Sequence, residues 1–123
     1  MHDLVETKFS IGIIVKHKFL HFRGVIFDVD PEFNNSEEWY MAIPKEIRPR
    51  KDQPFYHLLA ENKDIFYVAY VSEQNLLIDM DNSECCHPDI NKIFSHYDGE
   101  KYIPHARQII KLAARCGQFA PMI

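Results

Sequence analysis

Residues 16–23 combine cationic, imidazole and aromatic side chains within one short stretch. These side chains belong to Lys16, His17, Lys18, Phe19, His21, Phe22 and Arg23. Lysine and arginine can neutralise phosphate groups, while aromatic rings can stack on bases or insert between them. This combination fits a nucleic-acid surface. It also fits a solvated hairpin tip whose phenylalanines belong to the core, and the residue types leave both interpretations open.

A second group of polar and aromatic residues lies in a proline-rich stretch. It comprises Arg48, Pro49, Arg50, Lys51, Asp52, Gln53, Pro54, Phe55, Tyr56 and His57. Arginine and glutamine side chains are suited to bidentate contacts with bases or phosphates. In the alternative interpretation, Asp52 pairs with Arg50 or with another arginine and simply fixes the loop.

The carboxylates of Asp28, Asp30 and Glu32 alternate along the chain, as in the first part of a calcium-binding loop. The pattern then fails, because Phe33 stands where a glycine is required and Trp39 stands where a bidentate glutamate is required. We therefore predict no metal site here. These acids are expected to face solvent or to pair with the neighbouring basic segment.

Cysteine and histidine offer a second possible metal site. The candidate ligands are Cys85, Cys86, His87, His96, His105 and Cys116. Adjacent cysteines are poor partners for one tetrahedral zinc ion, so we predict reduced thiols in a polar link. The four glycines are scattered, and the sequence contains no phosphate-binding loop, nucleophile elbow or zinc-protease motif. We expect neither an enzyme nor a bound cofactor.

The charge of the 123-residue chain totals −4, and it is distributed unevenly. Residues 8–23 contain four basic residues and no acid, whereas residues 28–38 contain five acids and no base. Residues 61–100 contain nine acids against two lysines, and residues 101–123 contain four basic residues and no acid. DNA-binding domains are usually basic overall, so a DNA-binding role here requires a local basic patch.

The elements that must position these side chains are mostly short strands. Apolar and β-branched runs predict strands at residues 11–18, 22–29, 55–60, 65–71 and 76–78, the first two forming a hairpin. Between them, residues 32–54 form a long loop with one helical segment at 36–42. Five short strands with one long excursion predict a mainly β fold, a small five-stranded closed barrel. Short helical segments are expected at residues 88–94 and 106–115.

We divide the chain into a barrel domain with an acidic link and short helix at residues 1–104, and a basic, helical tail at 105–123. The sequence contains no apolar run of about 18 residues and no basic region preceding an apolar stretch at its start. We therefore expect a cytoplasmic protein without a membrane-spanning helix.

Four segments resemble one known family. They are FRGVIFDVDPEF at residues 22–33, EWY at 38–40, RPRKDQPFYHLLAEN at 48–62 and YVAYVSEQNL at 67–76. They resemble the heat shock protein HspQ family, also called the YccV-like hemimethylated-DNA-binding family, over about residues 9–104. The resemblance implies an SH3-like β-barrel, a bacterial cytoplasmic location, homo-oligomers and no enzymatic activity.

The family resemblance implies two classes of function. Members are described as binding hemimethylated DNA and restraining the replication initiator protein DnaA, and also as a specificity-enhancing factor for the Lon protease in the stress response. The first class implies a DNA-binding module with modest preference for hemimethylated duplexes. The second implies a protein adaptor that need not bind DNA.

Our candidate contacts for DNA or a protein partner lie in the two polar groups and the loop between them. They are Lys16, Lys18, Arg23, Trp39, Tyr40, Arg48, Arg50, Lys51, Gln53, Tyr56 and His57. A methyl group in the major groove needs an apolar contact, for which Trp39, Tyr40 and Phe55 are the candidates.

Overall fold

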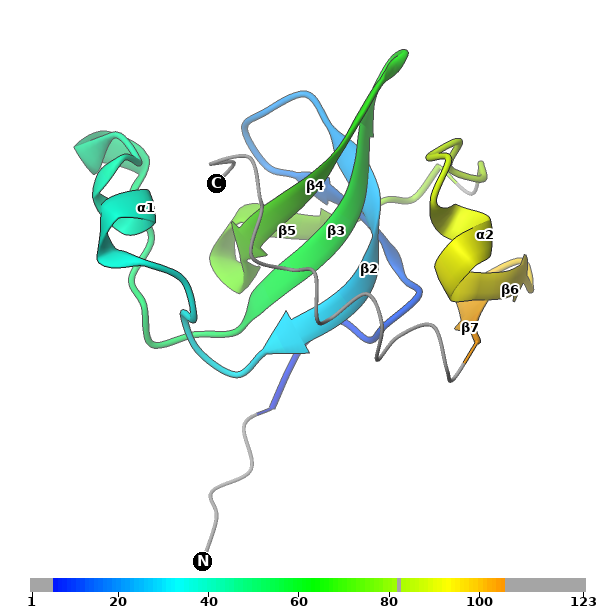
Figure 1. Cartoon of the computed structure of the whole chain (residues 1–123), viewed down its shortest axis with the longest axis horizontal. Coiled ribbons are helices and arrows are strands. Elements are labelled where there is room, and N and C mark those ends of the chain that lie inside the picture. Colours follow the sequence, from blue (N-terminus) through cyan, green and yellow to red (C-terminus); the bar gives the residue numbers. More distant parts are fainter. Residues whose placement is uncertain (1–5, 82, 106–123) are drawn as a thin grey trace, which may run out of the picture.

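The computed structural model describes residues 6–81 and 83–105. Its main feature is an antiparallel sheet of five strands in the order β4-β3-β2-β1-β5 (Figure 1). The strands are β1 (Ile14–His17), β2 (Arg23–Asp30), β3 (Phe55–Asn62), β4 (Ile65–Ser72) and β5 (Leu76–Ile78). All five predicted strands are present, and β1 and β2 pair as the predicted antiparallel hairpin.

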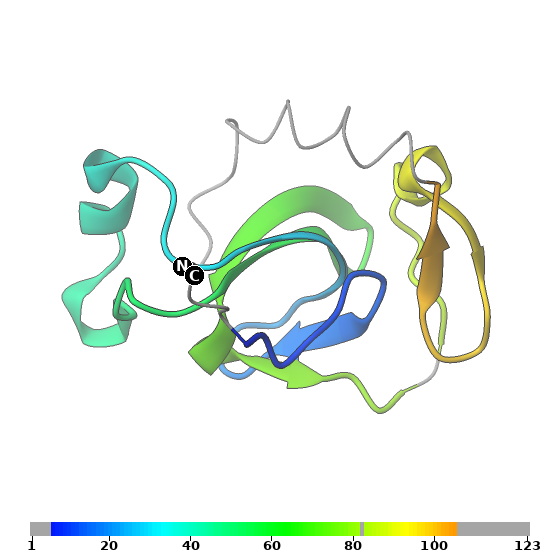
Figure 2. The ribbon, with the colours of Figure 1, turned by 90° about the horizontal axis from the view of Figure 1, so that it is seen from below.

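The sheet is strongly curved, but its pairing order is open (Figure 2). In the described part of the chain, β4 and β5 form the two edges and have no ladder between them. The mainly β fold is thus confirmed, whereas closure into an SH3-like barrel stays a prediction.

Strand β1 is shorter than the predicted run 11–18, because Gly12 interrupts it. Gly12 has φ +94°, a left-handed conformation that residues with a Cβ rarely adopt. Its N–H donates to the Ile26 carbonyl at 2.8 Å, and its carbonyl accepts from the Tyr102 N–H at 2.9 Å. The backbone therefore joins the main sheet to the C-terminal segment at this point.

The C-terminal segment contains a hairpin that the sequence pattern did not predict. Helix α2 covers only Ile90–Ile93, after which β6 (Phe94–Tyr97) pairs with β7 (Tyr102–Pro104). Phe94 and Tyr102 are buried, so the hairpin shields one face of the main sheet. The helix predicted at 88–94 is therefore confirmed only for Ile90–Ile93, because residues 88 and 89 form a turn and Phe94 begins β6. The predicted helix at 106–115 lies outside the described residues.

The sheet is covered on both faces by two apolar clusters. One cluster includes Val15, Ile26 and Leu58, and the other joins Val25 and Leu59 to residues of α2 and the β6–β7 hairpin. Alternate residues of β2 and β3 therefore point into different clusters. This arrangement buries the middle of β2 and most of β3.

The long loop between β2 and β3 carries helix α1 (Glu37–Met41) and the 3₁₀ helix η1 (Lys45–Ile47). The Ser36 hydroxyl accepts a hydrogen bond from the Trp39 N–H at 3.0 Å and caps the N-terminus of α1, within the helical segment predicted at 36–42. The loop lies on one side of the sheet, and α2 with β6–β7 lies on the other (Figures 1 and 2). No helix within residues 6–81 and 83–105 is long and apolar enough to cross a membrane.

Candidate nucleic-acid interface

The tip of the β1–β2 hairpin is held in shape by a buried histidine. His17 Nδ1 accepts hydrogen bonds from the Phe19 and Leu20 N–H groups, both at 3.0 Å, and its ring packs against Phe22 at 5.2 Å between centroids. Phe22 is buried in the core, whereas Phe19 is 68% exposed. Each of the two interpretations of this stretch therefore holds for one phenylalanine. Phe22 belongs to the core, and Phe19 is exposed to solvent.

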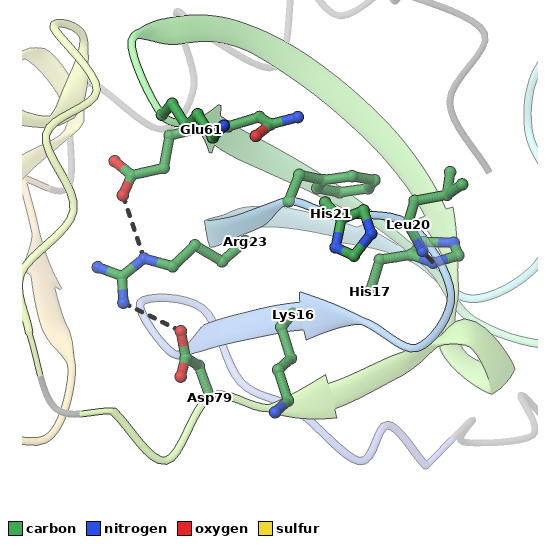
Figure 3. Close-up of a pocket in the computed structure, with 10 residues that line it drawn as sticks. Lys16, His17, Leu20, His21, Arg23, Glu61 and Asp79 are labelled. Atoms are coloured by element: carbon green, nitrogen blue, oxygen red, sulfur yellow. Dashed lines mark hydrogen bonds and ion pairs between the residues drawn. The ribbon is translucent and has the colours of Figure 1, made fainter.

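A pocket of about 360 Å³ lies between this hairpin and the turn that joins β3 to β4 (Figure 3). Its lining comprises Lys16, His17, Leu20, His21, Phe22, Arg23, Glu61, Asn62, Lys63 and Asp79. Lys16, His21 and Lys63 are exposed on its rim. Lys63 has φ +56° in the tight β3–β4 turn and is not among the contacts predicted from the sequence.

Arg23 lies in the same pocket but is already engaged. Its Nε donates to Glu61 at 3.1 Å and its Nη1 donates to Asp79 at 3.0 Å (Figure 3). The same guanidinium donates to the Ser83 carbonyl at 2.7 Å. Two carboxylates compensate its charge, so Arg23 links the acidic segment after β5 to the sheet.

A second groove, of about 340 Å³, brings the long loop next to the hairpin tip. It is lined by Lys18, Phe19, Glu46, Ile47, Arg48, Gln74 and Asn75. Arg48 is held in place because its guanidinium donates to the Ile43 carbonyl at 2.9 Å and to the Met41 carbonyl at 3.2 Å. The structure therefore brings Lys18 and Arg48 next to the exposed ring of Phe19, while Lys16 lines the neighbouring pocket.

The other polar candidates of the long loop are held by contacts within the loop. Arg50 Nε pairs with Asp52 at 2.9 Å, which is one of the pairings the sequence suggested. Lys51 pairs with Glu37 and lies 4.5 Å from the Tyr40 ring centroid. These pairs are exposed, so they contribute little to stability and can open to a ligand.

Gln53 is buried at the base of this loop. Its Nε2 donates to the Arg50 carbonyl at 2.8 Å, and its Oε1 accepts from the Gln74 N–H at 2.9 Å. The amide thereby connects the loop to the turn before β5, and its hydrogen-bonding groups point into the protein.

The three candidate rings for a methyl contact are less accessible than Phe19. Trp39 and Tyr40 are partly buried against Phe33, and the Tyr40 hydroxyl donates to the Pro49 carbonyl at 2.7 Å. Phe55 is 1% exposed and stacks on Tyr70. Phe55 therefore cannot touch a ligand while the fold is intact.

Tyr56 and His57 are also buried, because they lie in central strand β3. The Tyr56 hydroxyl donates to Glu73 at 2.7 Å, and burial together with this bond raises the pKa of Tyr56. His57 Nε2 lies 3.0 Å from Asp30 Oδ2. Both residues are far better placed to hold the core together than to reach a partner.

Asp28, Asp30 and His57 form a group whose possible metal-ligating atoms lie within 4.8 Å of one another. Within the group, Asp30 Oδ2 also accepts a hydrogen bond from the Tyr70 hydroxyl at 2.8 Å. The Asp28 carboxylate accepts from the Val29 N–H at 2.8 Å. Both carboxylates thus already accept hydrogen bonds from groups within the protein.

The two described cysteines are free thiols in different surroundings. Cys86 is exposed, whereas Cys85 is buried and its N–H donates to the Tyr102 hydroxyl at 3.0 Å. Burial raises the pKa of the Cys85 thiol to about 12, so this thiol stays protonated at neutral pH. A protonated thiol is a poor zinc ligand.

Residues 7–101 match the family described as hemimethylated DNA-binding protein YccV like. The chain is 35% identical over 107 residues to F-box only protein 21 of Homo sapiens and of Pongo abelii, and 34% identical to that of Mus musculus. The aligned region covers 86% of this chain but only 17% of each relative. No solved structure gives a significant match.

Proposed function

The chain belongs to the YccV-like hemimethylated DNA-binding protein family, and we propose that its β1–β2 hairpin binds duplex DNA and prefers hemimethylated sites. One observation carries this proposal. Phe19 is 68% exposed at the hairpin tip and shares one groove with the exposed Lys18, while the exposed Lys16 and Lys63 line the neighbouring pocket beside the same hairpin. None of these three lysines has an ion pair among the described residues.

The charge and the apolar ring have separate roles in this proposal. The lysines would contact phosphates, which gives affinity without sequence preference. Phe19 would contact the methyl group, because a base methyl in the major groove offers an apolar surface. Burying one methyl contributes about 0.8 kcal/mol, which corresponds to a roughly fourfold preference for a hemimethylated site over an unmodified one.

The test is a titration of unmodified, hemimethylated and fully methylated duplexes with the wild-type chain and the Phe19→Ala variant. Phe19→Ala should bind unmodified DNA nearly as well as wild type but lose the roughly fourfold preference for the methylated site. Met41→Ala is the matched control, since Met41 is 55% exposed on α1 and lies outside both grooves. Absence of DNA binding by the wild-type chain at low salt would refute the proposal.

The second candidate function is a protein adaptor, and the groove between Phe19 and Ile47 favours it. An exposed ring facing an apolar side chain across a groove is also a suitable anchor for a protein partner. Enhancement of Lon specificity belongs to this candidate, whereas regulation of DnaA belongs to the DNA-binding candidate, and both are predictions from the family resemblance. Measuring the rate at which Lon degrades a substrate, with and without this protein, separates the two candidates. An unchanged degradation rate at a saturating concentration of the protein would count against the adaptor.

A further inference from the structure

Strand β5 presents a free edge on the side of the sheet away from β2. It pairs with β1 in the register Lys16↔Leu77, and the flanking bonds run from Lys18 N to Asn75 O at 2.9 Å and from Asp79 N to Ile14 O at 3.1 Å. Because antiparallel residues alternate in the direction of their backbone groups, the Ile78 N–H and C=O point away from β1. Within residues 6–81 and 83–105, no strand pairs with this edge.

The free edge is unusually apolar. Leu77 is 44% exposed, Ile78 50% and Met80 80%. Natural proteins commonly protect such edges with lysine, proline or a covering segment, because an open apolar edge can pair with another chain. Strand β5 itself contains neither lysine nor proline.

A small pocket opens beside the edge. Its volume is about 130 Å³, and it is lined by Ile13, Ile14, Ile78, Asp79, Met80, Tyr97 and Glu100. Because side chains along an added strand alternate between the two faces, every second residue of an incoming strand could point towards this pocket. The volume suits one aliphatic side chain.

The border of this edge is acidic. Asp81 and Glu100 are exposed, and Asp98 lies two residues before Glu100 in the β6–β7 turn. Asp79 forms an ion pair with Arg23 at 3.0 Å, so its charge is partly compensated and it adds less to the negative potential at this border. An incoming segment with lysine or arginine beside its apolar residues would complement this border.

We propose that β5 binds an extended basic and apolar segment of a partner protein as a sixth strand of the sheet. The backbone of that segment would pair with Ile78, an aliphatic side chain would fill the pocket, and its cations would lie against Asp81 and Glu100. This mode of binding obtains affinity from main-chain hydrogen bonds and specificity from alternate side chains. It uses an edge separate from the Phe19 tip, so it does not depend on the proposed DNA binding.

A second copy of this chain fits the edge less well than a basic partner. Strand β5 consists of Leu76, Leu77 and Ile78 and carries no cation, so a second β5 would bring no opposite charge to this acidic border. A basic partner segment places opposite charges there instead.

The first experiment measures fluorescence anisotropy of a short labelled peptide in which lysine and valine alternate. The full chain should bind this peptide at least about tenfold more tightly than a peptide in which glutamate replaces lysine. It should also bind at least about tenfold more tightly than the same peptide with alternate backbone nitrogens methylated, which cannot donate ladder hydrogen bonds. Equal binding of all three peptides would overturn the proposal.

Two substitutions locate the site. Ile78→Lys should weaken binding of the lysine and valine peptide by about tenfold, because it removes the apolar contact and adds a like charge. Ile65→Lys is the matched control, since Ile65 is 64% exposed at the start of β4 on the other edge of the sheet. Equal loss in both variants, or no loss in Ile78→Lys, would contradict the assignment.

Hydrogen exchange gives a readout that does not depend on a substitution. The Ile78 amide should become protected when the peptide is added, while the Ile65 amide should not change. Peptide binding without protection of Ile78 would rule out strand addition. A concentration-dependent dimer that Ile78→Lys abolishes, without peptide binding by the wild type, would identify a second copy as the occupant and overturn the proposal.

Discussion

Asp30 ends strand β2 and links three parts of the core through its carboxylate. It accepts hydrogen bonds from His57 Nε2 at 3.0 Å and from the Tyr70 hydroxyl at 2.8 Å. Burial alone would raise the pKa of Asp30. The interactions with His57 and Tyr70 together lower this pKa by a larger amount, so it lies below the usual carboxyl value. The ionised form is therefore favoured by folding. Its stabilisation is complete above the unfolded pKa, near 4, and is lost as pH falls through the lower folded pKa.

Replacing Asp30 by asparagine should lower the free energy of unfolding at pH 7 by about 2 kcal/mol, because two partly buried hydrogen bonds to a charged group are weakened. The variant should also lose less stability than wild type as pH falls below about 4. Urea unfolding at pH 7, 5, 4 and 3 measures both effects. Asp81→Asn is the control at an exposed carboxylate, and equal acid sensitivity of Asp30→Asn and wild type would contradict the assignment.

Exposure is the property of a residue that the sequence predicted least well. Tyr56 and His57 were selected because they follow a basic loop, but they occupy a central strand covered on both faces. Phe19 was grouped with Phe22, and only the hydrogen bonds to His17 explain why one ring is buried and the other exposed. Residue type indicates which contacts a side chain can make, whereas its accessibility depends on contacts made by distant parts of the chain.

Gly12 connects the main sheet to the β6–β7 hairpin, and no other residue type fits its position. A Cβ at Gly12 would collide with the Tyr102 carbonyl oxygen, and its φ of +94° is unfavourable for residues with a Cβ. Gly12→Ala should lower the free energy of unfolding by about 3 kcal/mol and increase exchange of the Tyr102 amide. Gly99→Ala is a matched control, because Gly99 has φ +100° but open space around its Cα.

The Gly99 variant should lose only about 1 kcal/mol, the cost of the backbone conformation alone. The difference between the two alanine variants then measures the close contact between Gly12 and Tyr102. Equal destabilisation in urea unfolding would show that this contact does not hold the hairpin to the sheet.

The strands of the main sheet were predictable because their apolar runs are long and rich in β-branched residues. The β6–β7 hairpin was missed because Ile90, Ile93 and Phe94 also fit helical spacing, and β7 has only three residues. Asp98-Gly99 lies between these two strands and is itself a hairpin signal in the sequence. The local sequence pattern does not distinguish a helix from a hairpin here. The hairpin is stabilised by buried contacts of Phe94 and Tyr102 with the main sheet, which lie far away in the sequence.

Charge segregation over the whole molecule explains how an acidic chain could bind DNA. The net charge is −4, yet the exposed side chains of Lys16 and Lys63 line one pocket beside the β1–β2 hairpin, and Lys18 lines the neighbouring groove. If these three lysines contact phosphates, log Kd should rise with log salt with a slope of about 2.7. Affinity for an unmodified duplex should then fall by roughly fortyfold between 50 and 200 mM salt.

Replacing one of these lysines tests whether the patch is local. Lys16→Gln should reduce the slope by about 0.9, because one fewer counterion is released on binding. Lys92→Gln is the matched control, since Lys92 is exposed on α2 and pairs with Asp89 at 3.0 Å, on the side of the sheet that carries β6 and β7. Both variants have the same net charge, so a general charge effect would reduce binding equally in the two. Only a local patch predicts that Lys16→Gln lowers the slope while Lys92→Gln keeps the wild-type value.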